Sequence, residues 1–208
     1  MLYPKINTLW KRDEYNKFKI IDGSMSCPEF DSIKEWHVTE KIDGTNIRAY
    51  FDLDKKTTSF KGRKEETIIP HFLEYALANQ LHMHLYSSFL KSYKQVVLYG
   101  EGYGNKIQAA GKKYRTDVGF ILFDALVDGK WLDREELEEL ASQLNIKIVP
   151  TLGIMTTNEI IDLVKSNFNS TISEVEQIAE GVVARSNPIS LFSDGSPIMW
   201  KLKTRDYK

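Results

Sequence analysis

The chain has 208 residues, of which 42% are hydrophobic and 27% are charged, and its formal net charge at pH 7 is -1. These values are typical of a soluble globular protein and exclude a globally basic nucleic-acid-binding protein, so any such surface has to be local. Cys27 is the single cysteine, which excludes an internal disulfide and suits a reducing compartment. Residues 1–5 lack an apolar leader segment, and no run approaches the ~20 apolar residues of a membrane helix. We therefore expect a cytoplasmic protein without membrane association and with one domain over residues 1–208.

The first third of the chain predicts three strands. Residues 1–35 are mixed in character, and we expect a short helix and a loop at 22–24 within them. Apolar and polar residues alternate over 36–41 and again over 47–53, the period-two pattern of half-buried strands. A third, short strand is predicted to end at Arg63.

The middle of the chain predicts a helix followed by two strands. Pro70 is typical of the first turn of a helix. The apolar residues that then recur at helical spacing are Leu73, Leu77, Leu81, Leu85 and Phe89. Residues 95–101 and 118–127 are predicted strands, and the second is apolar on both faces around Asp124.

The last third predicts two helices and three strands. Asp133 is followed three residues later by Glu136, a capping-box pattern that begins a helix. Residues 146–149 are a predicted short strand, and Thr157 is predicted to cap a second helix.

Two further strands complete the prediction, over residues 180–185 and 198–203. Strands dominate and follow one another in hairpin-like order, with helices interspersed. We therefore predict the α+β class, with largely antiparallel sheets flanked by helices.

Lys41 lies at a predicted strand–turn–strand junction, where a loop on a rigid scaffold commonly carries chemistry. The sequence Lys41-Ile42-Asp43-Gly44 fits a nucleophilic amine that takes a nucleotide onto itself. It also fits a surface lysine before an Asp-Gly hairpin turn. The motif alone does not decide between these two interpretations, so its weight depends on the rest of the chain.

Three other stretches supply charged groups of the kind that such a lysine needs. Glu101 follows a strand and stands in a glycine-rich turn, and Glu180 begins a buried strand. Lys201 and Lys203 share one face of the last strand, because strand side chains repeat every two residues. Each stretch taken alone also fits a solvated loop or strand face.

As an ordered set, these stretches resemble the covalent nucleotidyltransferase superfamily of polynucleotide ligases and mRNA capping enzymes. The motifs in this chain are Lys41-Ile42-Asp43-Gly44, Tyr99-Gly100-Glu101, Phe120-Ile121-Leu122-Phe123-Asp124, Glu180-Gly181-Val182-Val183 and Trp200-Lys201-Leu202-Lys203. They cover nearly the whole chain. The resemblance implies the nucleotidyltransferase (ligase adenylation) fold, with the nucleotide site between the sheets. Members of the superfamily usually continue into an OB-fold or a small helical domain, and we expect neither of these C-terminal domains within the 208 residues.

Within the superfamily, Gly44-Thr45-Asn46 is similar to the RNA-ligase-2-type branch. DNA ligases usually carry an arginine where Asn46 stands, which favours RNA as the substrate. Asp43 departs from that branch, because Lys-x-Asp-Gly is typical of DNA ligases and capping enzymes. The resemblance therefore implies an ATP-dependent RNA ligase that joins 3′-hydroxyl and 5′-phosphate ends of RNA or of a nicked duplex.

The resemblance assigns catalytic roles to Lys41, Asp43, Lys201 and Lys203. Lys41 would attack the α-phosphorus of ATP and carry AMP as a phosphoramidate. A free lysine is almost entirely protonated at neutral pH. Because neighbouring cations disfavour a further positive charge, Lys201, Lys203 and a bound Mg²⁺ should increase the unprotonated fraction. The two lysines would also neutralise the α-phosphate, and Asp43 would act after adenylation.

The resemblance also implies a set of nucleotide-binding residues, to which Lys201 and Lys203 belong. Glu101 would bind a ribose hydroxyl, Arg63 the ribose or phosphate, and Phe123 would stack on the purine. Glu180 would hold Mg²⁺, with Mn²⁺ as an alternative, directly or through water. The remaining residues that the resemblance places at the nucleotide are Glu40, Ile42 and Asn46.

Further candidate contacts are basic residues that could bind RNA phosphates, with two tyrosines interleaved: Lys106, Lys112, Lys113, Arg115, Tyr103 and Tyr114. A merely solvated loop fits them equally well. Three alternative functions stay open. They are a GTP-dependent capping guanylyltransferase, a minimal DNA ligase, and a nucleotide- or RNA-binding module without catalysis.

Overall fold

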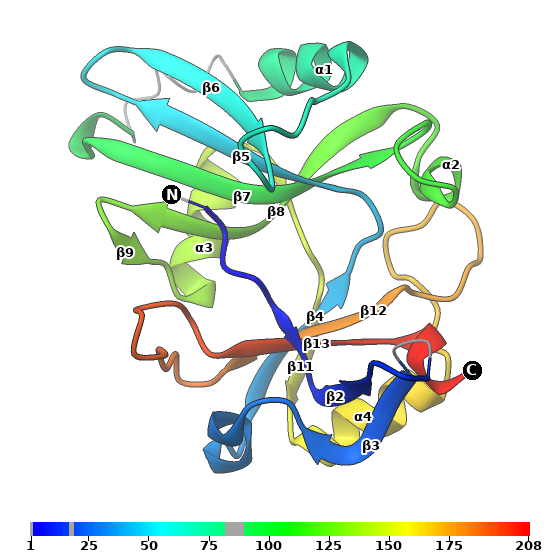
Figure 1. The fold of residues 1–208 in the computed structure, drawn as a ribbon. Coiled ribbons are helices and arrows are strands. Elements are labelled where there is room, and N and C mark those ends of the chain that lie inside the picture. The colour runs from blue at the N-terminus through cyan, green and yellow to red at the C-terminus, as the bar shows by residue number, and fades with distance from the viewer. Residues whose placement is uncertain (1, 17–18, 82–89) are drawn as a thin grey trace. The chain divides into compact units, whose positions relative to one another are not determined.

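The computed structural model describes residues 2–16, 19–81 and 90–208, and the chain divides into two compact units. We call residues 1–3 with 43–149 the central unit, and residues 4–42 with 150–208 the terminal unit. Each unit is built on its own mainly antiparallel sheet, with a few helices packed on it (Figure 1). The α+β class predicted from the sequence is confirmed.

The central unit contains a six-stranded sheet in the order β10-β8-β7-β5-β6, with β9 paired to β8. Its strands are β5 (Thr45–Asp52), β6 (Thr57–Gly62), β7 (Gln95–Gly104), β8 (Val118–Val127), β9 (Lys130–Trp131) and β10 (Lys147–Ile148). Its helices are α1 (His71–Leu81), α2 (Gly111–Tyr114) and α3 (Arg134–Gln143), with a 3₁₀ turn at Leu90–Ser92. The β10–β8 pair is parallel, and the other pairs in this sheet are antiparallel.

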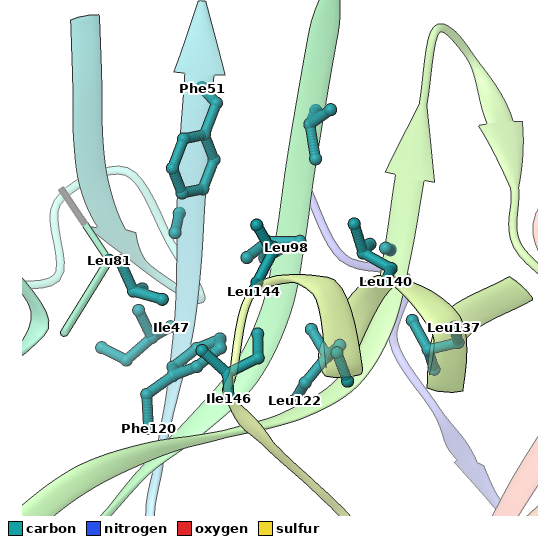
Figure 2. Close-up of a cluster of buried hydrophobic side chains, with 14 of the residues drawn as sticks. Ile47, Phe51, Leu81, Leu98, Phe120, Leu122, Leu137, Leu140, Leu144 and Ile146 are labelled. Carbon is teal, nitrogen blue, oxygen red and sulfur yellow. The ribbon is translucent and has the colours of Figure 1, made fainter. Parts of the chain in front are cut away.

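The core of the central unit lies between one face of this sheet and helices α1 and α3. Alternate residues of β5 enter it, namely Ile47, Ala49 and Phe51, as the predicted period-two pattern requires. Figure 2 shows Ile47 and Phe51 beside Leu98 of β7, together with leucines of α3. The opposite face of β5 therefore carries the polar residues of that strand.

Helix α1 begins directly after Pro70, as the sequence predicted. Its leucines Leu73, Leu77 and Leu81 are fully buried and cover the sheet. Leu85 and Phe89, which the same spacing assigned to this helix, lie outside the described residues.

The terminal unit contains a five-stranded sheet in the order β1-β13-β12-β4-β11. Its strands are β1 (Asn7–Thr8), β4 (Trp36–Lys41), β11 (Thr151–Met155), β12 (Gly181–Ser186) and β13 (Met199–Lys203). The other elements of this unit are the β2–β3 hairpin (Trp10–Asp13 and Lys19–Met25), α4 (Thr157–Lys165) and 3₁₀ turns at Pro28–Ser32 and Thr204–Tyr207. The β1–β13 pair is parallel, whereas β12 is antiparallel to both β4 and β13.

Helix α4 closes the core of the terminal unit. Ile160 and Val164 pack against Trp36, Val182 and Trp200 of the sheet. The predicted cap at Thr157 is wrong by one residue. Thr156 is the N-cap and forms a capping box with Glu159, because its hydroxyl is three residues before an acidic side chain.

The terminal unit differs from the sequence prediction in two other places. Residues 22–24 belong to strand β3 and not to a loop, and Gly23 accommodates a positive φ of 80° within it. Residues 151–155 form strand β11, which the sequence did not predict. In the described part of the chain, no helix is both long and apolar enough to cross a membrane.

Candidate active site

Lys41 is the last residue of β4, a strand of the terminal unit that is paired along both edges, to β11 and β12. Trp36, Val38 and Glu40 are buried, and Lys41 is half-buried, as the alternation in the sequence predicted. A lysine at the end of an internal strand is held by the sheet hydrogen bonds on either side. Its amine therefore projects from a rigid base.

The amine of Lys41 lies beside a carboxylate that it shares with a second lysine. It donates to Oε2 of Glu180 at 2.6 Å, and the amine of Lys203 lies 2.6 Å from Oε1 of the same residue. We call these three residues the lysine–glutamate triad. Burial by itself raises the pKa of Glu180, but the two ammonium groups outweigh it and hold that pKa below its ordinary value.

Gly181 is the residue that allows the triad to assemble. It follows Glu180 and is the register partner of Lys41 on β4 and of Lys203 on β13. Its φ is +152°, and an added Cβ would lie 2.1 Å from the carbonyl oxygen of Leu202. Glycine is therefore required at this position, and the Glu-Gly pair of the sequence motif has a geometric reason.

Lys201 lies two residues before Lys203 on β13 and is the register partner of Val183. Strand periodicity gives the two lysines the same face of the sheet, as predicted. From the sequence, both lysines are expected to act on Lys41 as neighbouring cations. The structure brings Lys203 to Lys41 through Glu180, and it places Lys201 two residues further along the strand.

Glu40, which precedes Lys41, has its carboxylate in the interior, where it is 1% exposed. It accepts from the backbone N–H of Thr171 at 2.8 Å, from the Thr171 hydroxyl at 2.7 Å and from the Ser170 hydroxyl. These bonds tie the loop after α4 to the end of β4. Ile42 is also buried, and its carbonyl oxygen lies 3.5 Å from the Lys41 amine.

The turn that begins the central unit is held at two points. The backbone N–H of Asp43 donates to the Tyr114 hydroxyl at 3.3 Å, and the Gln108 side chain donates to the Gly44 carbonyl at 3.1 Å. An added Cβ on Gly44 would lie 2.5 Å from the carbonyl oxygen of Gly102 and 2.6 Å from Cγ of Glu101. The glycine of Lys-x-Asp-Gly thus permits close packing against the strand that carries Glu101.

Asn46 and Glu101 are register partners on β5 and β7 of the central unit. Because cross-strand partners share a face of a sheet, both side chains lie on the face opposite the core. Among the described residues, Oδ1 of Asn46 is buried without a hydrogen-bond partner. A buried amide oxygen of this kind fits a site that accepts a hydrogen bond from a ligand.

Phe123 lies at the register shift where β8 bulges opposite Tyr99 and Gly100. Its ring meets that of Tyr3 edge-on at 5.0 Å between centroids, and the Tyr3 hydroxyl donates to Asp124 at 3.1 Å. The sequence alone does not single out Tyr3, because nothing in the local pattern links residue 3 to residue 124. Burial raises the pKa of Tyr99, whose ring lies tilted against that of Tyr3 in the same cluster.

The basic residues proposed for RNA binding differ in how much they are already engaged. Arg115 is bound to Asp117 and lies over the ring of Tyr103. Lys106, Lys112 and Lys113 are exposed. The tyrosines of this segment, Tyr103 and Tyr114, are 1% and 3% exposed and pack against one another. They are therefore core residues and cannot stack on RNA bases.

The described residues include no group of three or more His, Cys, Asp and Glu side chains that could hold a metal ion. At the triad, the group that could act as a metal ligand is the carboxylate of Glu180. This set fits Mg²⁺, which proteins usually bind through one or two carboxylates together with substrate phosphates and water.

Comparison with protein families places the chain in a known group. The family model described as RNA ligase matches residues 34–201, and the chain belongs to this family. The match begins just before β4 and ends within β13, so it includes Lys41, Glu180 and Lys201. The predicted membership of the nucleotidyltransferase superfamily is therefore confirmed.

Among solved structures, the chain is similar to RNA ligase from Naegleria gruberi. The E227A mutant with ATP and Mn matches with a TM-score of 0.69 and 20% identity, over 100% of this chain and 57% of that chain. The same ligase with PPi matches with a TM-score of 0.65 and 22% identity, over 98% of this chain and 60% of that one. These likenesses establish the fold, and the chain spans less than two thirds of those proteins. No curated protein sequence matched the chain.

Proposed function

We propose that this chain is an ATP-dependent RNA ligase that joins a 3′-hydroxyl to a 5′-phosphate through AMP carried on Lys41. The lysine–glutamate triad is the observation that supports the proposal most directly. It combines a half-buried amine at a rigid strand end with one carboxylate and a second cation, all within ion-pair distance. These are the groups that attack on a phosphate requires.

In the first step, the Lys41 nitrogen would form a bond to the α-phosphorus of ATP, and the bond to the pyrophosphate oxygen would break. The amine is ion-paired with Glu180, so it would have to release a proton to solvent before it attacks. Lys203 would then be free to neutralise charge on the α-phosphate. Bound Mg²⁺, held by Glu180, would supply further charge neutralisation at the phosphates.

Two transfers would complete the reaction. An RNA 5′-phosphate oxygen attacks the AMP phosphorus, and Lys41 leaves as the amine. The 3′-hydroxyl of the other RNA end then attacks the 5′-phosphate, and AMP leaves. Asp43 would act in these later steps, and Lys106, Lys112 and Lys113 would bind RNA phosphates.

Residues of the central unit would bind the nucleotide. Glu101 would accept a hydrogen bond from the ribose, Asn46 would use its buried amide oxygen, and Phe123 would stack on the purine. Arg63 would contact ribose or phosphate. Single substitutions of these residues should each weaken ATP binding, whereas Lys41→Ala should leave binding intact and abolish the covalent step.

Intact-mass measurement tests the first step. The native protein incubated with ATP and Mg²⁺ should gain the mass of AMP, and the Lys41→Ala protein should gain none. A matched Lys34→Ala protein, altered at an exposed lysine before the same strand, should gain AMP like the native protein. An adduct that persists in Lys41→Ala contradicts the assignment of the nucleophile.

Experiments with different nucleotides and nucleic acids distinguish the three alternative functions. An adduct formed from GTP and not from ATP would indicate a capping guanylyltransferase. Sealing of a nicked DNA duplex and not of a nicked RNA duplex would indicate a DNA ligase. No adduct with either nucleotide in the presence of Mg²⁺ would indicate a binding module without catalysis.

A further inference from the structure

Arg48 of β5 is a fully buried arginine in the central unit, with 0% exposure. Its Nε donates to the carbonyl oxygen of Gly62 at 2.8 Å, its Nη1 to the Tyr50 hydroxyl at 2.7 Å, and its Nη2 to the Glu65 carboxylate at 2.9 Å. A charge taken out of water is tolerated when its N–H groups are bonded and a counter-charge is near. The side chain is therefore committed to these partners.

Two of the three partners flank Arg63 in the chain. Gly62 precedes it as the last residue of β6, and Glu65 follows it by two residues. The turn is closed further by the Thr67 backbone N–H, which donates to the Lys64 carbonyl at 3.2 Å. The guanidinium of Arg48 thus holds the backbone before Arg63 through the Gly62 carbonyl, and it holds the chain after Arg63 through the Glu65 side chain. We call Arg48 and Glu65 the turn clamp.

The side chain of Arg63 is exposed. Within the described residues it has no ion pair or hydrogen bond, so its guanidinium is free for an anion. The Glu65 side chain is 62% exposed, and a glutamate is already charged over the neutral range. Its hydrogen bond with Arg48 lowers its pKa further. The clamp is therefore intact at the pH at which a nucleotide would bind.

We propose that Arg48 and Glu65 are positioning residues that hold Arg63 in place to bind the phosphate or ribose of ATP. The inference rests on the proposed function, in which Arg63 contacts the nucleotide. An arginine on a fixed backbone loses less conformational freedom when it binds an anion than one on a mobile turn. Loss of the clamp should therefore weaken nucleotide binding only through Arg63.

A double-mutant cycle between Glu65 and Arg63 tests this dependence. ATP affinity is measured by calorimetry in Lys41→Ala protein with Mg²⁺, so that no covalent step interferes. We expect Arg63→Ala to weaken binding about tenfold, and Glu65→Ala about threefold to fivefold. In the Arg63→Ala background, Glu65→Ala should have no further effect. In protein with Lys41 intact, Glu65→Ala should raise KM for ATP and leave kcat of self-adenylation unchanged.

Glu66→Ala is the matched control. Glu66 is the next residue, its side chain is 76% exposed, and its carboxylate lies 4.0 Å from the amine of Lys64. Its removal should leave ATP affinity unchanged. Arg48→Lys is a second probe: it retains the charge but cannot donate to Gly62 and Glu65 together, and it should match Glu65→Ala in direction.

Several results would overturn the inference. One is that Glu65→Ala weakens ATP binding equally in the presence and in the absence of Arg63. Another is that Glu65→Ala leaves ATP affinity unchanged although Arg63→Ala lowers it. A third is an Arg63→Ala protein with native affinity. Normal AMP adduct formation in these cases would leave the proposed function standing. Absence of both ATP binding and adduct would instead contradict the proposed function, and this inference with it.

Discussion

Two glutamates border Lys41 in the terminal unit, and their surroundings differ. Glu40 is fully buried and accepts from neutral donors, namely two hydroxyls and a backbone N–H of the loop at residues 170–171. Glu180 is half-buried and accepts from the ammonium groups of Lys41 and Lys203. One carboxylate is bound by short donors of a neighbouring loop, and the other by two long, flexible side chains.

This difference distinguishes a carboxylate that stabilises the fold from one that can take part in the reaction. Short donors attached to the backbone fix a loop and have no reason to change during a reaction. Lysine side chains can exchange a carboxylate partner for a phosphate, because both are anions and the lysine stem is flexible. We therefore expect substitutions of Glu180 to affect the reaction and substitutions of Glu40 to affect folding.

The largest effect is expected for Glu180→Gln. The amide retains the shape of the side chain but removes the counter-charge of two lysines and the proposed metal ligand. The rate of self-adenylation with ATP should fall at least about a hundredfold, the usual effect of removing one electrostatic group from an active site. A quench-flow time course of adduct formation measures it. A rate within about threefold of native would remove Glu180 from the mechanism.

Glu40→Gln should act on stability. Its amide nitrogen cannot accept, so at least one of the donors from Ser170 and Thr171 loses its partner in the interior. The expected cost is about 2 kcal/mol in the free energy of unfolding, measured by urea denaturation. Glu176→Gln is the control, because Glu176 is an exposed acceptor from Asn169 in the same loop. It should cost less than about 0.5 kcal/mol.

The KM for ATP in self-adenylation by Glu40→Gln protein tests the same difference between the two glutamates. A carboxylate that serves only the loop should leave KM for ATP unchanged once the protein is folded. A large rise in KM with native stability would instead mean that the Glu40 side chain binds the nucleotide, as the family resemblance implies.

The smallest effect is a pH dependence of stability. The two lysines hold the pKa of Glu180 below its ordinary value of 4.5 in the folded protein. A carboxyl group of this kind stabilises the fold above its unfolded pKa, and the contribution is lost as the pH falls through the folded value. The stability difference between native protein and Glu180→Gln should therefore be constant near neutral pH and shrink below about pH 4.5. Parallel curves down to about pH 3 would contradict the ion pairs.

Local patterns in the sequence predicted the elements that carry the triad. The alternation over 36–41 placed Lys41 at a strand end, and Asp133 with Glu136 forms the predicted capping box of α3. Thr156 was missed as a cap although Glu159 follows it at the right spacing. Strand β11 was missed because its sequence, interrupted by Gly153, lacks the alternation of β4.

Contacts between segments that are distant in the chain could not be predicted from local sequence patterns. The alternation in β5 assigned Arg48 to a polar face, and nothing local shows that Glu65 and Gly62 enclose it. The placement of Glu180 between two lysines follows from the register of β12 with its neighbour β13 and with β4, which is far away in the chain. Register of this kind depends on tertiary pairing, which residue spacing alone does not determine.

The backbone geometry at Gly181 has a consequence for any attempt to redesign this protein. A library that seeks altered nucleotide preference should keep this codon fixed, because even alanine would push Leu202 away and separate the strands that present both amines. Diversity is better introduced at Val183, two residues along, which is half-buried and does not share the positive φ that restricts residue 181 to glycine.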